Sequence, residues 1–571
     1  MDLPTEKAQR LLDRAARGTL GRRRFLEMAV ATGVAALLDP FQIEHALAAG
    51  RNQRANRRKP RDSYDYVIVG AGAAGCVLAS KLAQSGAEVL LIESGGSDDL
   101  PQVTTPGLWF TNLGGPLDWK FKAAPSAAVN NRAIPMAMGH VLGGGTSINA
   151  MLWVRGLWQD YDDWAYQGCD GWSFPDVLPI FKGLEDWEGG ANEWRGAGGP
   201  LHVRVSPDPH PTARAFVAAA GQMGIPILDD MNGPMREGAG YVNMSINKDG
   251  SRASAARAFL RPVLDRPNLT LLLNSDVTRL LFKGSRCTGV ALHGTDGIRT
   301  VEASREVLVT AGGMGSAKLL LLSGIGDAGD SRHLGIDPVA DLSGVGRNFQ
   351  DHPLLFGVVL RYKGKMPPRA MTSNAVEAAA YVRSGGETFG PDIKMVLQQV
   401  PVATPEIAAA FGAPPQDAFV ISPALMRPSS RGRYHLAGAD WRDPARLDAG
   451  FLSTEHDLDK TARCIEMCRE LGRQTGFDPI REAEVIPGRP LDKAALYDFA
   501  RNATISFGHP VGTCKMGVDA LAVVDPQLRI HGVEGLRVCD SSIMPTIITG
   551  PTSAASHMIG AKAADMILKA A

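Results

Sequence analysis

The chain has 571 residues, with 60 basic and 60 acidic side chains, 64 glycines and 37 prolines. This length is too great for one small domain and predicts two intimately connected domains around a large core. The balanced charge gives no electrostatic reason to expect binding to nucleic acid or to an anionic membrane. The many glycines and prolines predict numerous tight turns, as in a large α/β enzyme.

The first 48 residues are predicted to be an export signal and not part of the fold. Arg22-Arg23-Arg24-Phe25-Leu26 precedes an apolar run from Met28 to Leu38, and Ala46-Leu47-Ala48 has the small-x-small pattern of a cleavage site. This pattern predicts export of the folded protein by the twin-arginine (Tat) machinery, to the periplasm or out of the cell. The alternative is an amphipathic or disordered tail.

The apolar run Met28–Leu38 is too short to span a bilayer, and no later stretch is long and apolar enough to do so. No transmembrane segment is therefore predicted. Residues 49–62, rich in Arg and Lys, are predicted to form a linker to the folded part of the chain.

The most informative motif begins at residue 65. Val67–Val69 is a short apolar run, long enough for one buried strand of a parallel sheet. Gly70, Gly72 and Gly75 then fit the pattern G-x-G-x-x-G, in which the glycines allow a tight turn, close approach to a pyrophosphate, and close packing of helix on strand.

A helix over about Gly75–Gln84 would aim its N-terminal N–H groups at the phosphates. The following strand, Val89–Ile92, delivers Glu93, whose carboxylate suits two ribose hydroxyls and would repel a 2′-phosphate. Strand, turn, helix, strand and acid in this order predict a dinucleotide site, with a glycine-rich turn of another α/β protein as the alternative. The motif does not separate NAD from FAD.

A second glycine-rich block contains three consecutive glycines, Gly143 to Gly145. Such a run is unsuited to the interior of a helix or strand, and fits a place where backbone lies against a flat or charged ligand. Thr146, Ser147 and Asn149 add hydroxyl and amide groups to it. The alternative is a mobile glycine loop.

Further helices and strands are predicted along the rest of the chain. A loop is predicted over Pro101–Asp118, and the helices and strands predicted after it are a mostly helical Trp164–Trp187, a helix Ala213–Met223, a strand from Asn268, two strands at Val277 and Gly289–Leu292, a strand Glu306–Thr310, and a helix Ser316–Leu322. The strand before Ala311-Gly312-Gly313 and the helix after it are assigned to the same nucleotide-binding sheet as residues 67–93.

Residues from about 355 to 500 change to alternating stretches and a long helix, about Leu458–Thr475, and predict a separate lobe that could roof a site. The C-terminal block then holds Ser506-Phe-Gly-His509-Pro, a strand Leu536–Asp540, and a final helix of about Ser553–Leu568. Seven scattered cysteines without a C-x-x-C pair predict buried free thiols, with neither a disulfide framework nor a metal site.

These blocks together resemble the glucose–methanol–choline (GMC) oxidoreductases, over roughly residues 63–571. The resemblance implies an α/β (α+β) fold with a Rossmann-like FAD-binding domain and a substrate-binding domain built on an antiparallel sheet with helices. It implies an FAD-binding domain over 63–355, with substrate-domain insertions at about 157–250, a substrate-binding domain over 356–500, and a return to the FAD-binding domain over 501–571.

The resemblance also assigns residues to FAD. Glu93 would hold the adenosine ribose, Val277 would touch adenine through its backbone, and the segment from Gly143 to Asn149 would lie along the pyrophosphate and flavin. The full set of cofactor positions that it implies is Gly70, Gly72, Ala73, Ala74, Gly75, Glu93, Gly143, Gly144, Ser147, Asn149, Val277, Asp540, Ser541, Thr552 and Ser553. Some relatives attach FAD covalently through a histidine at the position of Ile148, so a noncovalent flavin is expected here.

His509 matches the family's catalytic histidine. Oxidation of an alcohol moves its α-hydrogen to the flavin as hydride, and a neutral imidazole near working pH can take the hydroxyl proton. The family usually places a second His or Asn at the position of Pro551, which has no side-chain donor or acceptor. Pyridoxine-oxidising members are similar in having proline there, which points to an activated heteroaryl alcohol.

Other residues near these motifs are not expected to take part in the reaction. Gly508, usually an aromatic residue in relatives, would widen the site. His557 is expected to pack within the final helix, and His140 and His352 are interpreted as structural. The implied reaction is oxidation of a primary or secondary alcohol, aryl, heteroaryl or choline-like, with electrons passed to oxygen or to a quinone-like or cytochrome acceptor. The alternative is a non-redox lyase of the hydroxynitrile type.

Overall fold

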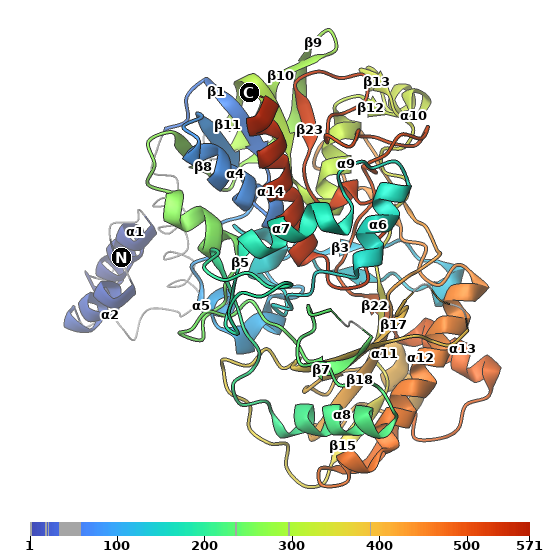
Figure 1. Cartoon of the computed structure of the whole chain (residues 1–571). Helices are drawn as coiled ribbons and strands as arrows, with labels where there is room; N and C mark the ends of the chain where they lie inside the picture. The colour runs from blue at the N-terminus through green and yellow to red at the C-terminus, as the bar shows by residue number, and fades with distance from the viewer. Residues whose placement is uncertain are drawn as a thin grey trace.

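The computed structural model describes residues 3–16, 20, 22–32, 59–234, 237–294, 297–386, 388 and 390–570. Two large sheets organise this part of the chain, one in the upper half of Figure 1 and the other in the lower half, with the C-terminal helix descending from the first toward the second. The mixture of a largely parallel and an antiparallel sheet confirms the predicted α/β fold class.

The first sheet runs in the order β8-β2-β1-β11-β10-β9, and β23 adds to β11. Its β8, β2, β1, β11 and β23 pair in parallel, whereas β10 and β9 form an antiparallel extension. Every residue of β2 is buried, as expected for a parallel strand covered on both faces. The bounds are β1 Ser63–Val69, β2 Val89–Ile92, β8 Leu269–Leu272, β9 Asp276–Lys283, β10 Arg286–Gly294, β11 Gly297–Val309 and β23 Leu536–Val538.

Three helices position the first sheet's motifs: α4 (Ala73–Gln84), α9 (Gly312–Leu322) and α14 (Ser553–Ala570). Helix α14 packs closely on α4, because a Cβ on Gly560 would lie only 2.4 Å from the carbonyl oxygen of Ala74. Helix α7 (Phe174–Leu184) packs beside α14, and α6 (Trp158–Tyr166) packs on α7 (Figure 1).

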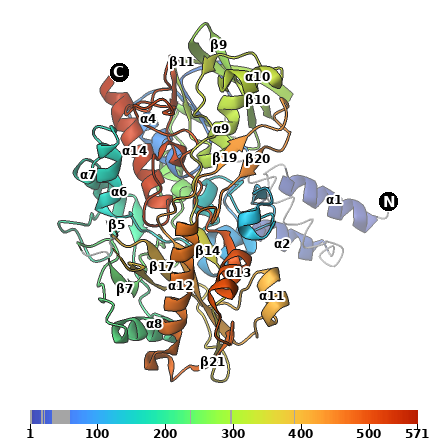
Figure 2. The ribbon, with the colours of Figure 1, turned by 90° about the vertical axis from the view of Figure 1, so that its right-hand side faces the viewer.

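The second sheet runs in the order β21-β15-β18-β17-β16-β7, with β14 joining β18 to β22, and its pairings are antiparallel. Its strands are β7 Gly238–Tyr241, β14 Pro353–Leu355, β15 Val359–Tyr362, β16 Ala378–Val382, β17 Ile393–Gln398, β18 Ala418–Leu425, β21 Arg481–Ile486 and β22 Thr504–Ser506. The surrounding helices are α8 Pro211–Gln222, α11 Pro405–Phe411, α12 Glu455–Arg473 and α13 Lys493–Ala503 (Figure 2).

The two faces of the second sheet have different neighbours, because side chains alternate along a strand. On β17, Ile393, Met395 and Leu397 belong to a core shared with α8, α12 and α13. Val396, between them in sequence, belongs to a different cluster that includes Met151 and Leu152. One face therefore packs on helices, and the other faces the segment that follows the triple-glycine block. We call this second face the roof.

Most predicted elements are confirmed, including the long helix of the second lobe, which is α12, and the final helix, which is α14. The loop predicted over Pro101–Asp118 is wrong in part. Residues Pro101–Thr104 form a short helix and Pro106–Asn112 a 3-10 helix, each with proline in its first turn, where its missing N–H costs no hydrogen bond. The residue boundaries of the predicted domains stay a prediction.

The N-terminal segment forms two helices, α1 (Leu3–Ala16) and α2 (Arg22–Ala31), that stand apart from both sheets (Figures 1 and 2). Their apolar side chains, among them Leu11 and Phe25, form a small cluster of their own. The end of the predicted apolar run and the predicted cleavage site, Ala46–Ala48, lie outside the described residues. Among the described helices, none has the length and apolarity needed to cross a bilayer.

Candidate active site

The first motif forms a close crossing of backbone at the carboxyl end of β1. Gly70 has φ of 102°, and a Cβ there would lie 2.6 Å from the carbonyl oxygen of Thr310. A Cβ on Gly75 would lie 2.0 Å from the carbonyl oxygen of Gly70. The Thr310 hydroxyl donates to that same oxygen at 2.7 Å and ties the turn to β11. Only glycine fits at either position, as the motif predicted.

Glu93 follows β2 and is buried beside this turn. One of its carboxylate oxygens accepts from the Ala71 backbone N–H and the other from the Gly95 N–H, both at 2.8 Å. Burial raises the pKa of Glu93 to about 7, against the lowering effect of these two bonds. Each oxygen keeps acceptor capacity, which suits a pair of ribose hydroxyls, and the contact with ribose stays a prediction.

The triple-glycine block lies directly on the first motif. The Gly143 backbone N–H donates to the carbonyl of Ala71 at 2.8 Å, and a Cβ on Gly144 would lie 2.9 Å from the Cα of Gly72. Ser147 fixes the block by donating from its hydroxyl to the Leu142 carbonyl at 2.6 Å. Two glycine motifs some seventy positions apart in sequence therefore meet at one edge of the sheet.

Asn149, predicted to face the flavin, has its side-chain oxygen engaged within the protein. It accepts from the Met151 N–H at 3.0 Å and from the guanidinium of Arg252 at 2.9 Å. Arg252 is fully buried and also donates to the Asn149 carbonyl at 2.7 Å. This bracing holds the end of the triple-glycine block, while the amide N–H groups of Asn149 are left for other acceptors.

The glycines at this edge leave the space that a cofactor needs. An ideal Cβ on Gly72, Gly145 or Gly312 meets no heavy atom within 4 Å. Helices α4 and α9 both begin here. The N-cap residue of α4, Gly72, has no side chain to cap the first N–H groups, whereas the first N–H of α9, that of Gly312, donates to Asp540. The uncapped N-terminus of α4 favours an anion, so the residues present fit the diphosphate of FAD.

Asp540 and Ser541 join the last block to this edge. Asp540 accepts from the Gly312 N–H at 2.8 Å, from the Ser316 hydroxyl at 2.5 Å and, through its other oxygen, from the Ser542 N–H at 2.8 Å. The Ser541 hydroxyl donates to the Pro510 carbonyl at 3.2 Å. The two side chains thus fasten β23 to α9 and to the His509 segment, and direct contact with FAD stays a prediction.

The other predicted positions adjoin the same edge. Ala73 and Ala74 form the first turn of α4, and Thr552 and Ser553 lie at the start of α14, which packs on it. Val277 is the second residue of β9, where it pairs with β10. Their contacts with FAD also stay predictions.

His509 is positioned by the pairing of β14 with β22. Pro353 is opposite Ser506 in this pair, so the residues just beyond each strand meet. Asp351 accepts from the His509 backbone N–H at 2.9 Å and from the Ser506 hydroxyl at 2.5 Å. Gly508 has φ of 76°, a conformation that an aromatic residue would adopt only with strain, which explains glycine at this position.

The His509 ring forms a hydrogen bond with the ring of His352, with 2.9 Å between their Nδ1 atoms. His352 Nε2 is 3.1 Å from the carbonyl oxygen of Met426, which can only accept, so this nitrogen carries the proton of a neutral ring. His352 Nδ1 is then the acceptor, and His509 Nδ1–H the donor. The Nε2 of His509 is left with a free lone pair.

Both imidazoles are held neutral. Burial lowers the pKa of His352 to about 3. Burial also lowers the pKa of His509 well below its ordinary value, and His352 and Lys394 add to this effect. At neutral pH His509 is therefore a neutral base with its acceptor nitrogen defined.

The interpretation of His352 as merely structural was incomplete, because its ring contacts the predicted catalytic histidine. The sequence Asp351-His352-Pro353 could have indicated this role, because it places a carboxylate and an imidazole next to each other at the start of a strand. His557 does pack as expected, between the rings of Trp153 at 5.3 Å and Phe259 at 5.6 Å. Pro551 is buried, and Thr552 separates it from the first residue of α14.

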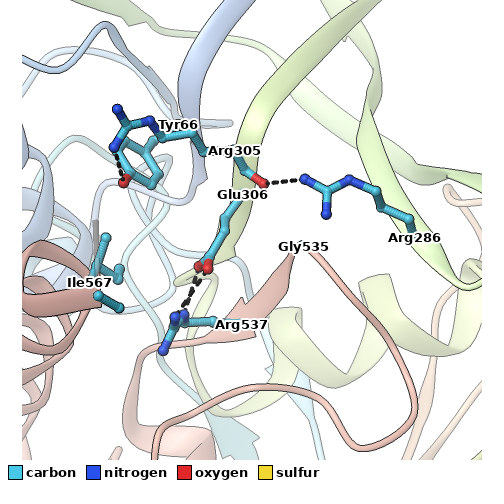
Figure 3. Close-up of a pocket in the computed structure, with 8 residues that line it drawn as sticks. Tyr66, Arg286, Arg305, Glu306, Gly535, Arg537 and Ile567 are labelled. Carbon is cyan, nitrogen blue, oxygen red and sulfur yellow. Dashed lines mark hydrogen bonds and ion pairs between the residues drawn. The ribbon is translucent and has the colours of Figure 1, made fainter.

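All seven cysteines are buried and free, which confirms that prediction. A separate pocket, shown in Figure 3, is lined by Tyr66, Arg286, Arg305, Glu306, Gly535, Arg537, Ile567 and Ala570. Two of these residues, Ile567 and Ala570, lie at the C-terminal end of α14, whereas Ser553 lies at its N-terminal end. The Glu306 carboxylate in this pocket is already paired with Arg537 at 2.6 Å. This pocket is thus separate from the predicted cofactor edge.

Comparison with known proteins agrees with the geometry. Residues 64–354 and 428–560 match the two family models described as GMC oxidoreductase. With the fold and the glycine-lined edge, these matches define a flavoprotein oxidoreductase. The chain belongs to the GMC oxidoreductases, a family of FAD enzymes that act on alcohols.

Relatives resemble nearly the whole chain. It is 38% identical to proteins named oxygen-dependent choline dehydrogenase from Brucella ovis and Brucella suis, over 88% of this chain and 95% of theirs. The crystal structure of a pyridoxine 4-oxidase from Mesorbium loti is similar with a TM-score of 0.85 and 32% identity, over 89% of this chain and 99% of that one. A fungal aryl-alcohol oxidase, 23% identical with a TM-score of 0.76 over 90% and 100% of the two chains, shows the same fold.

We expect Gly75→Ala to lower the free energy of unfolding by at least about 2 kcal/mol, because its methyl group would overlap the Gly70 carbonyl. FAD content should fall with it, since the displaced helix N-terminus faces the cofactor edge. Gly183→Ala is the matched control, because that position on α7 has open space, and it should be neutral or slightly stabilising. Denaturant unfolding and bound flavin per protein measure both effects. Equal behaviour of the two variants would contradict the close crossing.

We expect His352→Leu to slow flavin reduction by about 10²-fold, because His509 then loses the acceptor that fixes its tautomer. His352→Asn, whose Oδ1 can accept in place of Nδ1, should keep the rate within about tenfold of the parent. Stopped-flow reduction under argon, with flavin content measured alongside, separates the two. Equal losses in both variants would show that the acceptor atom is not what matters.

Proposed function

We propose that this chain oxidises a primary or secondary alcohol to an aldehyde or ketone, with His509 as the base. The observation that carries this proposal is the pair of hydrogen bonds that leaves a neutral His509 with a free Nε2. A base of this kind accepts the hydroxyl proton at that atom as the substrate carbon loses hydride. The bound FAD would supply the hydride acceptor.

The residues around His509 support proton transfer in a dry site. The imidazolium that forms keeps its Nδ1–H on His352, so the ring does not turn as it takes the proton. Asp351 does not neutralise that charge directly, because it is occupied by the His509 backbone N–H and by Ser506. Phe507 stacks on the imidazole at 4.5 Å between ring centroids and excludes water from one face.

We propose that FAD is held noncovalently. Ile148, at the position where some relatives carry a histidine, is a buried aliphatic residue with no nucleophile. Glu93 would hold the ribose, and the open positions at Gly72, Gly145 and Gly312 would admit the diphosphate. Denaturation should therefore release free FAD.

The substrate is proposed to be an aryl, heteroaryl or choline-like alcohol. Support comes from relatives named choline dehydrogenase, pyridoxine 4-oxidase and aryl-alcohol oxidase. Pro551 gives no polar group to a substrate hydroxyl, so proton removal depends on His509 without a second side chain at that position. An alcohol activated by an adjacent ring would need less help.

The electron acceptor is proposed to be oxygen or a quinone-like or cytochrome acceptor, the first in keeping with relatives named oxygen-dependent. We also propose that the Tat machinery exports the protein to the periplasm or beyond, on the basis of Arg22-Arg23-Arg24 and the apolar run after it. Export in the folded state would allow FAD to be loaded in the cytoplasm.

We expect alcohols of the preferred class to bleach the flavin absorbance under argon, and His509→Asn to slow that bleaching by about 10²- to 10⁴-fold with flavin content unchanged. His456→Asn, at an exposed histidine in the first turn of α12, is the control and should not alter the rate. Admitting air after reduction then reports whether oxygen is the acceptor. A protein that converts substrate without any bleaching would instead be a lyase.

A further inference from the structure

The roof carries a buried lysine that the proposed chemistry does not use. Lys394 lies on β17, is fully buried, and its Nζ has no hydrogen-bond partner among the described residues. It alternates with Ile393 and Met395, which face the helices, so its side chain lies on the opposite, roof side of the sheet. An ammonium group buried without an acceptor is costly, which calls for an explanation.

A second polar group without a partner lies next to Lys394. Tyr381 is directly opposite it on β16, is 3% exposed, and its hydroxyl has no hydrogen-bond partner in the described part of the chain. The Lys394 Nζ is 4.9 Å from the centre of the Tyr381 ring. Two donors on adjacent strands of one face thus both lack a hydrogen-bond acceptor, and the lysine has only cation–π contacts with aromatic rings.

These donors lie beside the His509 site. The Lys394 Nζ is 5.4 Å from the centre of the Phe507 ring, and that ring stacks on His509. The positive charge of Lys394 contributes to the lowered pKa of both His352 and His509. One aromatic ring therefore separates the lysine from the base that would act on the alcohol.

Burial lowers the pKa of Lys394 to about 7, so a large fraction of the side chain is charged near neutral pH. An anion placed against it would be attracted and would raise that fraction, whereas a cation would be repelled. No carboxylate among the described residues forms an ion pair with it, and burial is the one cause of its lowered pKa. The acceptor must then come from outside the chain.

We propose that Lys394 and Tyr381 form a recognition site for an anionic oxygen, a carboxylate or a phenolate, carried by the alcohol substrate. The inference rests on the proposed alcohol oxidation, and it narrows the substrate class to alcohols that carry an acidic group. It also disfavours choline, whose quaternary ammonium would face a buried cation.

The test compares matched alcohols on the FAD-loaded enzyme under argon: 4-(hydroxymethyl)benzoate, the neutral 4-(hydroxymethyl)benzamide, 4-hydroxybenzyl alcohol as the phenol, and choline. We expect the benzoate or the phenol to reduce the flavin with kcat/KM at least about tenfold above the amide, and choline to be the poorest. Which of the two acidic alcohols is faster separates a carboxylate site from a phenolate site.

Binding is measured separately with 4-methylbenzoate and with p-cresol, which lack the alcohol, by calorimetry. Lys394→Met should weaken binding of the preferred one by about 10- to 100-fold, and Tyr381→Phe by about 3- to 10-fold. Lys248→Met, at a lysine 80% exposed, is the control and should leave binding unchanged. Replacing an unpaired buried cation by methionine should not lower the melting temperature.

Several outcomes overturn the inference. They are a benzoate and a phenol that both react no faster than the amide, choline as the best substrate, or a Lys394→Met variant that loses affinity equally for neutral and anionic ligands. Slower reoxidation by oxygen with unchanged 4-methylbenzoate and p-cresol affinity would assign the lysine to the acceptor reaction instead. If Lys394→Met does not fold, the lysine is structural, and Tyr381→Phe alone decides whether an anion is bound.

The inference and the proposed function fail in different ways. If benzyl alcohols bleach the flavin without preference for an acid, the anion site is refuted and alcohol oxidation stands. If no alcohol bleaches the flavin but 4-methylbenzoate or p-cresol binds through Lys394, alcohol oxidation is refuted and the anion site stands.

Discussion

The hydrogen bond between the Nδ1 atoms of His352 and His509 is the contact on which the chemistry of this site depends. The two histidines are brought together by a short strand pair, because His352 lies just before β14 and His509 follows shortly after β22 at the same end of that pair. The carbonyl of Met426, on a third segment, fixes the proton of His352 on its Nε2. It thereby decides which nitrogen of His509 is free. Backbone pairing in the second sheet thus determines a protonation state at the cofactor edge of the first.

Much of the cofactor edge was predictable from sequence because its constraints are local. The turn at Gly70 and the close packing at Gly75 are steric requirements within one β-α unit, and glycine is the residue that meets them. The same reasoning placed Glu93 at the end of β2. The contact of Gly144 with Gly72 was only implied by family resemblance, since nothing local to either motif specifies the other.

What sequence did not reveal lies where distant segments meet. Asp351, His352 and Met426 act through a hydrogen-bond chain formed by β14, β22 and the end of β18, and no spacing rule joins them. Lys394 was missed for another reason. An alternating strand gives no sign of which face carries the site, so a lysine within it is first assumed to reach solvent. The short helices after Pro101 were missed because they show no apolar period.

The roof and the histidine pair beside it hold more basic groups than acidic ones, and this excess links substrate recognition to catalysis. Three basic groups, Lys394, His352 and His509, lie close together in a dry region, and the nearest acid, Asp351, is committed to backbone and serine donors. They cannot all be charged. Burial keeps both imidazoles neutral, and the positive charge of Lys394 adds to this effect.

An anion beside Lys394 would change that balance in the direction that catalysis requires. Its charge would offset the lysine's, and the part of the His509 pKa depression that Lys394 causes would be relieved. The base would then accept a proton more readily when an acidic substrate is in place than when the site holds water or a cation. Selectivity for the substrate and activation of His509 would in that way share one electrostatic cause, because the same ammonium group that attracts the ligand also contributes to the lowered pKa of the imidazole.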